Sequence, residues 1–522
     1  MFLKIVIFLI FLAKICNAAN ILAIVPTPSF SHQVAFTELW KDLSLRGHKV
    51  TLLTTDPRND PDLPNLKEIN MKRSYKIWSD TYSFSEAAQD GLGFWNIWEF
   101  FLYLLSDICD DQLSQPEMQD LIHGKEKYSF DLVIIEVFYP ELLAFGKIYN
   151  CPTMLVATID STVQMYQYLG NPAHPVLNSD INVPYFGKLT FRERVTACLF
   201  YWNAVYFEYL KFLPTKQKLV DKFFGNLTNA RIEELISGID LMLVNINPLL
   251  KGPRALGPTT ISVGGGNHLK PLKPLPKELK DFLDDAKEGF IYFSLGGNVK
   301  SKDLRGQTMT NIIETLKELP YKVLWKFEAD ELPGKPENIK LIKWAPQQDI
   351  LRHPNIKLFI SQGGIQSMEE AIYTHVPLIV VPFYGDQLKN ARIVEYKGFG
   401  KFINRKPVLK KEELKSAILE LINNPKYKAS IKELARLMQD QPMTGLQKSV
   451  WWTEHIIRNK GAKHLRNPAV DLPLYQYYLV DVIAFIVSIA IAIILISLKI
   501  IKLFIKLFSN LYVEKINKRK LE

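Results

Sequence analysis

A pair of glycines in the second half of the chain lies where phosphate groups are commonly bound. Gly363 and Gly364 follow an apolar stretch, residues 356–360, that is typical of a buried strand, and a helical pattern begins directly after them. In a strand–turn–helix of this kind, backbone N–H groups and the positive end of the helix dipole face an anion. Glu370 falls on the expected helix, where a carboxylate could accept hydrogen bonds from ribose hydroxyls. Together these positions indicate a nucleotide-binding site.

Further polar residues follow other expected strands. Asp386 and Gln387 come after residues 377–382, and a carboxylate and an amide are suited to hydrogen-bonding the hydroxyls of a sugar. An earlier turn can bring backbone amides to a phosphate, which makes Gly296 and Asn298 candidate contacts to a diphosphate. A tight turn without a ligand would have the same sequence. The hypothesis of a nucleotide-sugar site therefore depends on the whole array.

His32 is the residue of the first half that could take a proton in a reaction. It follows the apolar stretch 21–25 and lies at the expected start of the first helix, for which Ser31 is a candidate N-cap. The helix dipole disfavours imidazolium at this end, so the ring should be neutral and able to accept a proton. A histidine at a helix start is often only structural, and the position alone leaves both interpretations open.

Both halves of the chain alternate apolar strands with helical patterns, which predicts parallel sheets covered by helices on both faces. In the first half we expect strands at residues 21–25, 49–55, 130–136 and 153–158. In the second half we expect them at residues 290–295, 322–326, 339–342, 356–360 and 378–381. Residues 257–276 are rich in glycine and proline without a period, which indicates a linker. The expected fold class is α/β, with two doubly wound Rossmann-like domains.

The two ends of the chain carry apolar segments of different kinds. Residues 1–19 have the pattern of a cleaved secretory signal. Residues 482–498 hold no charge and, at about 1.5 Å per residue, are just long enough to cross a bilayer. The basic residues after them predict a cytosolic C-terminus and a lumenal body, and residues 518–522 look like a dilysine-type retrieval signal of the endoplasmic reticulum. A buried core helix and a basic tail on negative lipid are the alternatives.

Two aromatic-rich stretches with a helical pattern, residues 78–103 and 191–224, leave three interpretations open. They could line a cavity for lipophilic molecules, form ordinary core helices or rest on a membrane surface.

Composition argues against several other classes. The net charge is +10, but much of the excess lies in the tail and no basic stripe is interleaved with aromatic residues, so nucleic-acid binding is not expected. No His/Cys cluster has zinc spacing, and Asp60-Pro-Asp62 sits in a proline-rich loop, so we expect neither a metal nor another cofactor. Removal of Cys16 with the signal leaves an odd number of cysteines, at least one of them free unless it pairs with another chain. Asn226-Leu-Thr228 is a candidate glycosylation site.

The array at residues 359–387 resembles the donor-binding signature of the UDP-glycosyltransferases of animal detoxification, the family that includes the UDP-glucuronosyltransferases. The likeness covers nearly the whole chain and is closest to insect members. It implies a GT-B fold, in which two Rossmann-like domains face a cleft. The expected organisation is a signal peptide at 1–19, an N-terminal acceptor-binding domain at 20–256, a linker at 257–276, a UDP-sugar-binding domain at 277–440, return helices and a membrane-proximal segment at 441–478, a transmembrane helix at 479–498 and a basic cytosolic tail at 499–522.

The resemblance also implies roles for individual residues. Trp344 would stack on uracil, and Gln347 would bind the ribose together with Glu370, while Asp386 and Gln387 would hold the transferred sugar. Most family members carry histidine where this chain has a glutamine that would contact the diphosphate through an uncharged hydrogen bond. The full set expected to bind the UDP-sugar is Gly296, Asn298, Trp344, Gln347, Gln362, Gly363, Gly364, Gln366, Glu370, Asp386 and Gln387.

In the family, the position matched by His32 holds the catalytic base, and an aspartate at the end of a later strand orients it. This chain has Glu136 at that place, with one methylene more. A solvated glutamate at a strand end is the alternative. Arg254 could pair with a glucuronate carboxylate, although similar arginines accompany glucose users.

The sequence therefore predicts an inverting, metal-independent UDP-glycosyltransferase anchored in the endoplasmic reticulum membrane. It would transfer a hexose to the hydroxyl of a small lipophilic acceptor in detoxification or specialised metabolism, with glucose favoured over glucuronate by the likeness to insect members. Its partners would be the UDP-sugar, the acceptor and membrane lipid; oligomers are compatible with the sequence. Gln362 and Glu136 keep a second hypothesis open, a non-catalytic pseudo-enzyme that binds UDP-sugar or a lipophilic ligand.

Overall fold

The computed structural model describes residues 18–90, 92, 94–304 and 306–519. Except for its last two residues, the predicted signal peptide lies outside the described residues, as do residues 520–522 of the predicted retrieval signal. The chain divides into two compact units, Met1–Arg466 and Asn467–Glu522. Both predicted Rossmann-like domains belong to the first unit.

The first sheet has seven parallel strands in the described residues, in the order β3-β2-β1-β4-β5-β6-β7. The strands are β1 (Asn20–Val25), β2 (Lys49–Thr54), β3 (Leu66–Asn70), β4 (Leu132–Glu136), β5 (Thr153–Ala157), β6 (Leu241–Val244) and β7 (Thr260–Ser262). The four predicted strands of this half are confirmed, and β3, β6 and β7 were not predicted. Because β7 lies inside residues 257–276, the segment predicted as an irregular linker begins as part of the first sheet.

The second sheet has six parallel strands in the described residues, in the order β10-β9-β8-β11-β12-β13. The strands are β8 (Phe290–Ser294), β9 (Lys322–Lys326), β10 (Ile339–Ile342), β11 (Ile356–Ser361), β12 (Leu378–Val380) and β13 (Gly400–Phe402). All five predicted strands are confirmed to within a residue, and β13 is additional. In both sheets the strand order reverses once, between β1 and β4 and between β8 and β11, and ligands of doubly wound sheets bind outside the carboxyl ends at such points.

Helices cover both faces of these sheets. Ile21 and Ala23 of β1 pack into one hydrophobic core, whereas Leu22 and Ile24, which point to the opposite face, pack into another. In the first half the helices are α2 (Phe30–Val34), α3 (Thr37–Leu45), α4 (Phe84–Asp90), α5 (Ile97–Leu113), α6 (Pro116–His123), α7 (Ala144–Tyr149), α8 (Val163–Tyr168), α9 (Phe191–Phe207), α10 (Leu213–Thr228), α11 (Ile232–Ser237) and α12 (Pro248–Lys251). In the second half they are α13 (Lys277–Asp284), α14 (Gly306–Lys317), α15 (Gln347–Leu351), α16 (Ile365–Tyr373), α17 (Gln387–Tyr396), α18 (Lys411–Asn423), α19 (Pro425–Gln439) and α20 (Gly445–Asn459).

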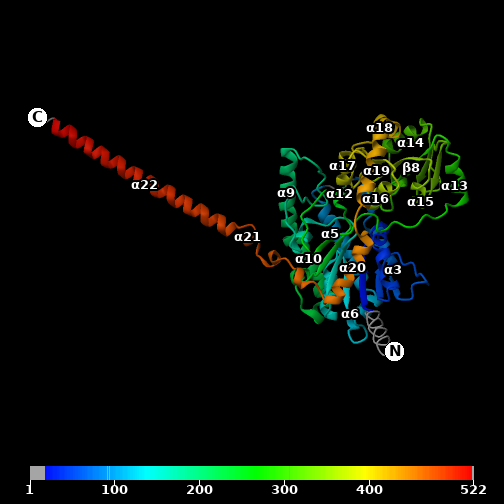
Figure 1. The fold of residues 1–522 in the computed structure, drawn as a ribbon, viewed down its shortest axis with the longest axis horizontal. Helices are drawn as coiled ribbons and strands as arrows, with labels where there is room; N and C mark the ends of the chain where they lie inside the picture. The colour runs from blue at the N-terminus through cyan, green and yellow to red at the C-terminus, as the bar shows by residue number, and fades with distance from the viewer. Residues whose placement is uncertain (1–17, 91, 93, 305, 520–522) are drawn as a thin grey trace, which may run out of the picture. The chain divides into compact units, whose positions relative to one another are not determined.

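Helix α20 returns to the first sheet. Although it follows the second sheet in the chain, it lies beside α3, orange next to blue in Figure 1, and its Val450 and Ile456 join the core around Ile21. A capping box fixes its start, because Thr444 accepts a hydrogen bond from the backbone N–H of Gln447 while the Gln447 side chain accepts one from the backbone of Thr444. The two sheets are therefore joined twice, by the segment after β7 and by α20.

The second unit contains α21 (Leu474–Tyr477) and α22 (Val480–Arg519). Among the described residues, one helix is long and apolar enough to cross a membrane, at Val480–Asn517. It begins one residue after the predicted span 479–498 and continues far beyond it. Most of the predicted basic tail, residues 499–519, is thus helical in continuation of the apolar segment.

Candidate active site

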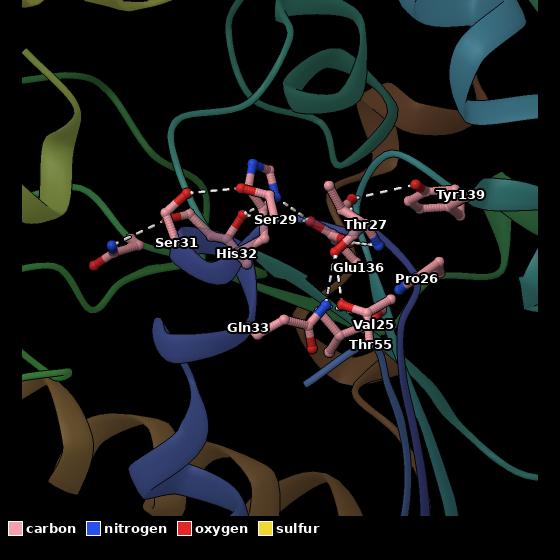
Figure 2. Close-up of polar contacts among 12 residues, drawn as sticks. Val25, Pro26, Thr27, Ser29, Ser31, His32, Gln33, Thr55, Glu136 and Tyr139 are labelled. Carbon is pink, nitrogen blue, oxygen red and sulfur yellow. Dashed lines mark hydrogen bonds and ion pairs between the residues drawn. The ribbon is translucent and has the colours of Figure 1, made fainter. Parts of the chain in front are cut away.

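His32 and Glu136 meet at the point where the strand order of the first sheet reverses. His32 follows β1 and lies in α2, and Glu136 is the last residue of β4, the strand next to β1. Oε1 of Glu136 lies 2.5 Å from Nδ1 of His32. Figure 2 marks this contact by a dashed line. The extra methylene of glutamate, compared with the aspartate of the family pattern, still permits this contact.

Hydroxyl groups surround the fully buried carboxylate of Glu136. Thr27 donates to its Oε2 from Oγ1 at 2.7 Å and from the backbone N–H at 3.2 Å (Figure 2). Thr158 Oγ1 lies 2.9 Å from Nδ1 of His32 and 3.4 Å from Oε1 of Glu136. If Nδ1 donates its proton to Glu136 across this short contact, Nε2 is left as the proton acceptor of the ring.

The first helical segment is shorter than the sequence predicts. It is split into α2, of five residues, and α3, and Ser29 rather than Ser31 occupies the N-cap position of α2. Ser29 Oγ lies 3.0 Å from Ser31 Oγ and accepts a hydrogen bond from Asn298 Nδ2 at 3.0 Å. The loop that positions His32 thus contacts the turn after β8 of the second sheet.

A cavity of about 320 Å³ opens between the two sheets. Its wall includes His32 and every residue predicted to bind the UDP-sugar except Gly363. Gly363 has φ of +90°, and a Cβ there would lie 2.5 Å from Val380 Cγ1, so this glycine shapes the turn rather than the cavity wall. We call this space the donor cavity.

Trp344 presents its ring at one end of the donor cavity. The side chain is 57% exposed, its ring packs edge-on against Phe30 at a centroid distance of 5.2 Å, and Lys326 Nζ lies 5.5 Å from its centroid. A large, open aromatic face of this kind can stack on a planar base.

Glu370 lies in a network of polar side chains beside that ring. Gln347 Nε2 donates to its Oε2 at 2.6 Å, and Gln348 Nε2 donates to its Oε1 at 3.1 Å. Nε2 of His268, a buried residue that sequence reasoning missed, lies 3.2 Å from the same Oε1. Burial lowers the pKa of His268, but the contact with Glu370 and the charges of Glu370 and Glu369 outweigh it, so the pKa is raised.

The two predicted phosphate turns face each other. Gly296 has φ of +76°, and a Cβ at this position would lie 2.5 Å from Nε2 of Gln362. Gln362 Oε1 is buried without a hydrogen-bond partner among the described residues. Asn298 Nδ2 donates to Ser29 Oγ and to Tyr384 Oη, at 3.0 and 3.1 Å. The turns after β8 and β11, at the second reversal of strand order, therefore form one polar surface.

The residues predicted to hold the sugar line the same cavity. Asp386 precedes α17, accepts a hydrogen bond from Asn390 Nδ2 at 2.8 Å and lies 3.7 Å from Lys251 Nζ. Gln387 Oε1 accepts hydrogen bonds from the backbone N–H groups of residues 383 and 384, and the same side chain contacts the hydroxyl of Tyr384. Gln366 Nε2 donates instead to the carbonyls of residues 31 and 158, so this side chain ties the second domain to the first.

A second cavity, of about 140 Å³, adjoins the first and shares His32, Ile159, Asn298, Tyr384 and Asp386 with it. We call it the acceptor cavity. Most of its wall is aromatic or aliphatic, including Trp78, Trp98, Phe101, Phe138, Phe207 and Phe212. The aromatic stretches thus line a cavity in part, whereas other members, such as Phe191, Trp202 and Tyr206, are exposed on the outer surface.

Several other residues lie outside these cavities. Arg254 forms a two-pronged ion pair with Asp160, at 2.9 and 2.6 Å, so its guanidinium is already engaged. Asn226 is exposed in the last turn of α10, which leaves its glycosylation a prediction. The three described cysteines are free, and the described residues contain no group of three or more His, Cys, Asp or Glu side chains that could hold a metal ion.

Two doubly wound parallel sheets that face a common cleft define the GT-B class of glycosyltransferases. Solved structures share this fold: spinosyn forosaminyltransferase SpnP matches 85% of this chain and 100% of its own with a TM-score of 0.55 and 15% identity. The glycotransferase of kitacinnamycin matches 85% of this chain and 99% of its own with a TM-score of 0.52 and 16% identity.

Sequence comparisons narrow the class. The model of a family described as UDP-glucoronosyl and UDP-glucosyl transferase matches residues 20–515. UDP-glycosyltransferase UGT5 of Dactylopius coccus is 33% identical over 91% of this chain and 90% of its own. UDP-glucuronosyltransferase 2B13 of Oryctolagus cuniculus is 31% identical over 88% of each chain. The chain therefore belongs to the UDP-glucoronosyl and UDP-glucosyl transferase family and is a UDP-glycosyltransferase.

Proposed function

We propose that the chain transfers a hexose from a UDP-sugar to the hydroxyl of a small lipophilic acceptor, with His32 as the general base and Glu136 as the residue that orients it. One observation carries this proposal. His32 lines both the donor cavity and the acceptor cavity, while its Nδ1 is held by Glu136. A base in this position can reach an acceptor hydroxyl beside the anomeric carbon of a bound sugar.

In the proposed reaction, the acceptor oxygen forms a bond to C1 of the sugar as the bond from C1 to the UDP oxygen breaks. The electron pair leaves with the diphosphate, and the acceptor proton passes to Nε2 of His32. Attack opposite to the leaving group inverts the configuration at C1. The diphosphate would lie between the turns that carry Gly296, Asn298, Gln362 and Gly364. The Gln362 amide and the backbone N–H of Gly364 would donate to it, whereas the N–H of Gly296 and Nδ2 of Asn298 already donate to protein oxygens. Trp344 would stack on the uracil ring and Glu370 would bind the ribose.

Glucose is the favoured sugar. A relative from Dactylopius coccus with 33% identity over 90% of this chain is named UDP-glucosyltransferase 2. Arg254, the candidate partner for a glucuronate carboxylate, is already paired with Asp160. Detoxification or specialised metabolism would supply lipophilic acceptors that suit the aromatic cavity.

The test is incubation of the full-length protein in microsomes with UDP-glucose or UDP-glucuronate and a panel of phenols and alcohols, followed by product masses. A glucoside of at least one acceptor is expected. The alternative is a pseudo-enzyme that binds UDP-sugar or a lipophilic ligand without turnover. The unpartnered Oε1 of Gln362, at the position where most family members carry histidine, is the observation in its favour. Tight UDP binding without any product would favour that alternative.

We further propose that α22 anchors the protein in the endoplasmic reticulum membrane, with both Rossmann-like domains lumenal and the C-terminus cytosolic. The helix is long and apolar enough, and basic residues follow its apolar part. Protease treatment of sealed microsomes should remove a C-terminal tag and spare the body. A protected tag would contradict this orientation.

A further inference from the structure

One wall of the acceptor cavity carries polar side chains that the transfer reaction does not use. Glu208 begins η4 (Glu208–Phe212), a π-helical turn between α9 and α10, and it lines the cavity. π-Helical turns are frequent at functional sites, where they place a side chain that a regular helix would direct elsewhere. His32, by contrast, reaches the cavity from α2, the short helix after β1.

The carboxyl group of Glu208 lies in an apolar setting without a cation. Its side chain is 8% exposed, and Tyr168 donates a hydrogen bond to Oε1 at 2.9 Å. No ion pair joins it to another of the described residues. Burial raises the pKa of Glu208 to about 7, an effect that the hydrogen bond from Tyr168 opposes. Burial of a carboxyl group with so few partners costs stability, which favours a use for it in ligand binding.

A second polar group lies on the same wall. Gln164 is one turn before Tyr168 on α8, so the two side chains share a face of the helix. Gln164 is 7% exposed and lines the cavity, and its Nε2 has no hydrogen-bond partner in the described part of the chain. Gln164 thus supplies an unpartnered amide donor on the helix face that carries the tyrosine in contact with Glu208, and its enclosed Nε2 must turn toward the cavity to meet a ligand.

We propose that Gln164 and Glu208 bind a second hydroxyl group of the acceptor, distinct from the hydroxyl that His32 deprotonates. This inference rests on the proposed function. A hydroxyl can donate to Glu208 and accept from Gln164 at once, which an ammonium group cannot do because it only donates. The acceptors would be lipophilic molecules with two hydroxyl groups, one held at this wall and one beside the sugar. Acceptors without the second hydroxyl leave both side chains unpaired and bind more weakly.

Other titratable groups share the cavity with Glu208. Tyr168 contacts it directly, and Lys216 of α10 is buried in an ion pair with Glu141 at 2.9 Å. His32 and Asp386 line the cavity where it meets the donor cavity. Matched acceptors that differ only in the second hydroxyl meet the same surrounding groups, so the ratio of their turnover isolates the contribution of Glu208.

The experiment uses the full-length protein with UDP-glucose and two matched series of acceptors. One series consists of 4-alkylphenols of increasing chain length, and the other of the same phenols with a hydroxyl at the chain end. In the wild type, at the chain length that spans the cavity, the hydroxyl should lower KM by about tenfold with kcat unchanged, as expected for one hydrogen-bonded group remote from the reaction. Glu208→Leu and Gln164→Leu should each reduce that preference, and Glu117→Leu, an exposed site on α6, should keep it.

The preference should also increase as the pH rises through about 7, because ionised Glu208 is the stronger acceptor, and it should be independent of pH in Glu208→Gln. Equal effects of the variants on both series, or no preference at any chain length, would overturn the inference while phenol turnover still supports the proposed function. If the wild type forms no product from any phenol or alcohol with either UDP-sugar, the proposed function fails. In that case the affinities of both acceptor series are measured by calorimetry in the presence of UDP. Tighter wild-type binding of the acceptors with the second hydroxyl, lost in Glu208→Leu, supports the inference. Equal wild-type affinities for the two series overturn it.

Discussion

Replacing Glu136 with glutamine tests how the ring of His32 is oriented. In the wild type, Oε1 of Glu136 lies 2.5 Å from His32 Nδ1, and Oε2 accepts both the backbone N–H and the hydroxyl of Thr27. Glutamine has a single acceptor oxygen, and the N–H of Thr27, which can only donate, holds it. The amide NH₂ group then faces Nδ1 and donates to it.

The ring must respond by carrying its own proton on Nε2, because Nδ1 now accepts. A ring protonated at Nε2 cannot take the proton of the acceptor hydroxyl, whereas the donor cavity is unchanged. The corresponding tautomer error costs about 10⁴ in kcat in Ser-His-Asp triads. We expect kcat of Glu136→Gln to fall by roughly 10²–10³, less than on removal of the base itself, with the affinity for UDP retained.

The assay is steady-state turnover of a phenol with UDP-glucose, together with the affinity for UDP measured by calorimetry. Because base and orienting residue act as one unit, the double variant with His32→Ala should be no slower than His32→Ala alone. Glu117→Gln, at an exposed position of α6, is the matched control and should keep the wild-type kcat. A folded Glu136→Gln enzyme within about tenfold of wild-type kcat would refute the orienting role.

Further predictions concern the donor cavity. Trp344→Ala should weaken UDP binding by about 1–3 kcal/mol, the range measured for base stacking on aromatic side chains, and unchanged affinity by calorimetry would contradict the stacking role. Gly296→Ala should raise the donor KM, because the added Cβ would lie 2.5 Å from Gln362 Nε2 at a backbone φ of +76°; a normal KM would show that this turn does not contact the donor. The raised pKa of His268 means that its charged form stabilises the fold below about pH 6.5 and that this contribution is lost as the pH rises through the raised value. The affinity for UDP should fall over the same pH range, because Glu370 loses its cationic neighbour. If the UDP affinity of His268→Ala depends on pH in the same way as that of the wild type, His268 is not the cause of the fall.

The sequence predicts the parts of the fold that have strong periodicity. The strands next to the two points of reversed strand order, β1, β4, β8 and β11, are apolar runs followed by polar turns, and all four were predicted. The missed strands are short or atypical. β6 is a run of four buried apolar residues, too short to be distinguished from a piece of helix, and β7 has three residues in a glycine-rich stretch. Strand β3, at the sheet edge, is mostly polar.

The sequence predicted those residues of the candidate site that belong to a motif. It missed the residues that come together only in the folded structure. His32 and Glu136 are 104 positions apart, yet each follows or ends a strand, so their contact could be expected. Thr27, Thr158 and His268 gave no signal, because lone threonines and histidines in loops have no distinctive spacing. The polar wall of the acceptor cavity depends on a π-helical turn, which sequence periodicity does not reveal.

The central claim is that His32 removes the proton of the acceptor hydroxyl where the two cavities meet. The most direct test is kcat of His32→Ala, measured by mass detection of the glucoside, beside the dissociation constant of UDP for the same preparation. Loss of the base should lower kcat by roughly 10²–10⁴ and leave the dissociation constant nearly unchanged, because the proposed uracil and ribose contacts, Trp344 and Glu370, belong to the other domain. Near-normal turnover by a correctly folded His32→Ala enzyme would contradict the account.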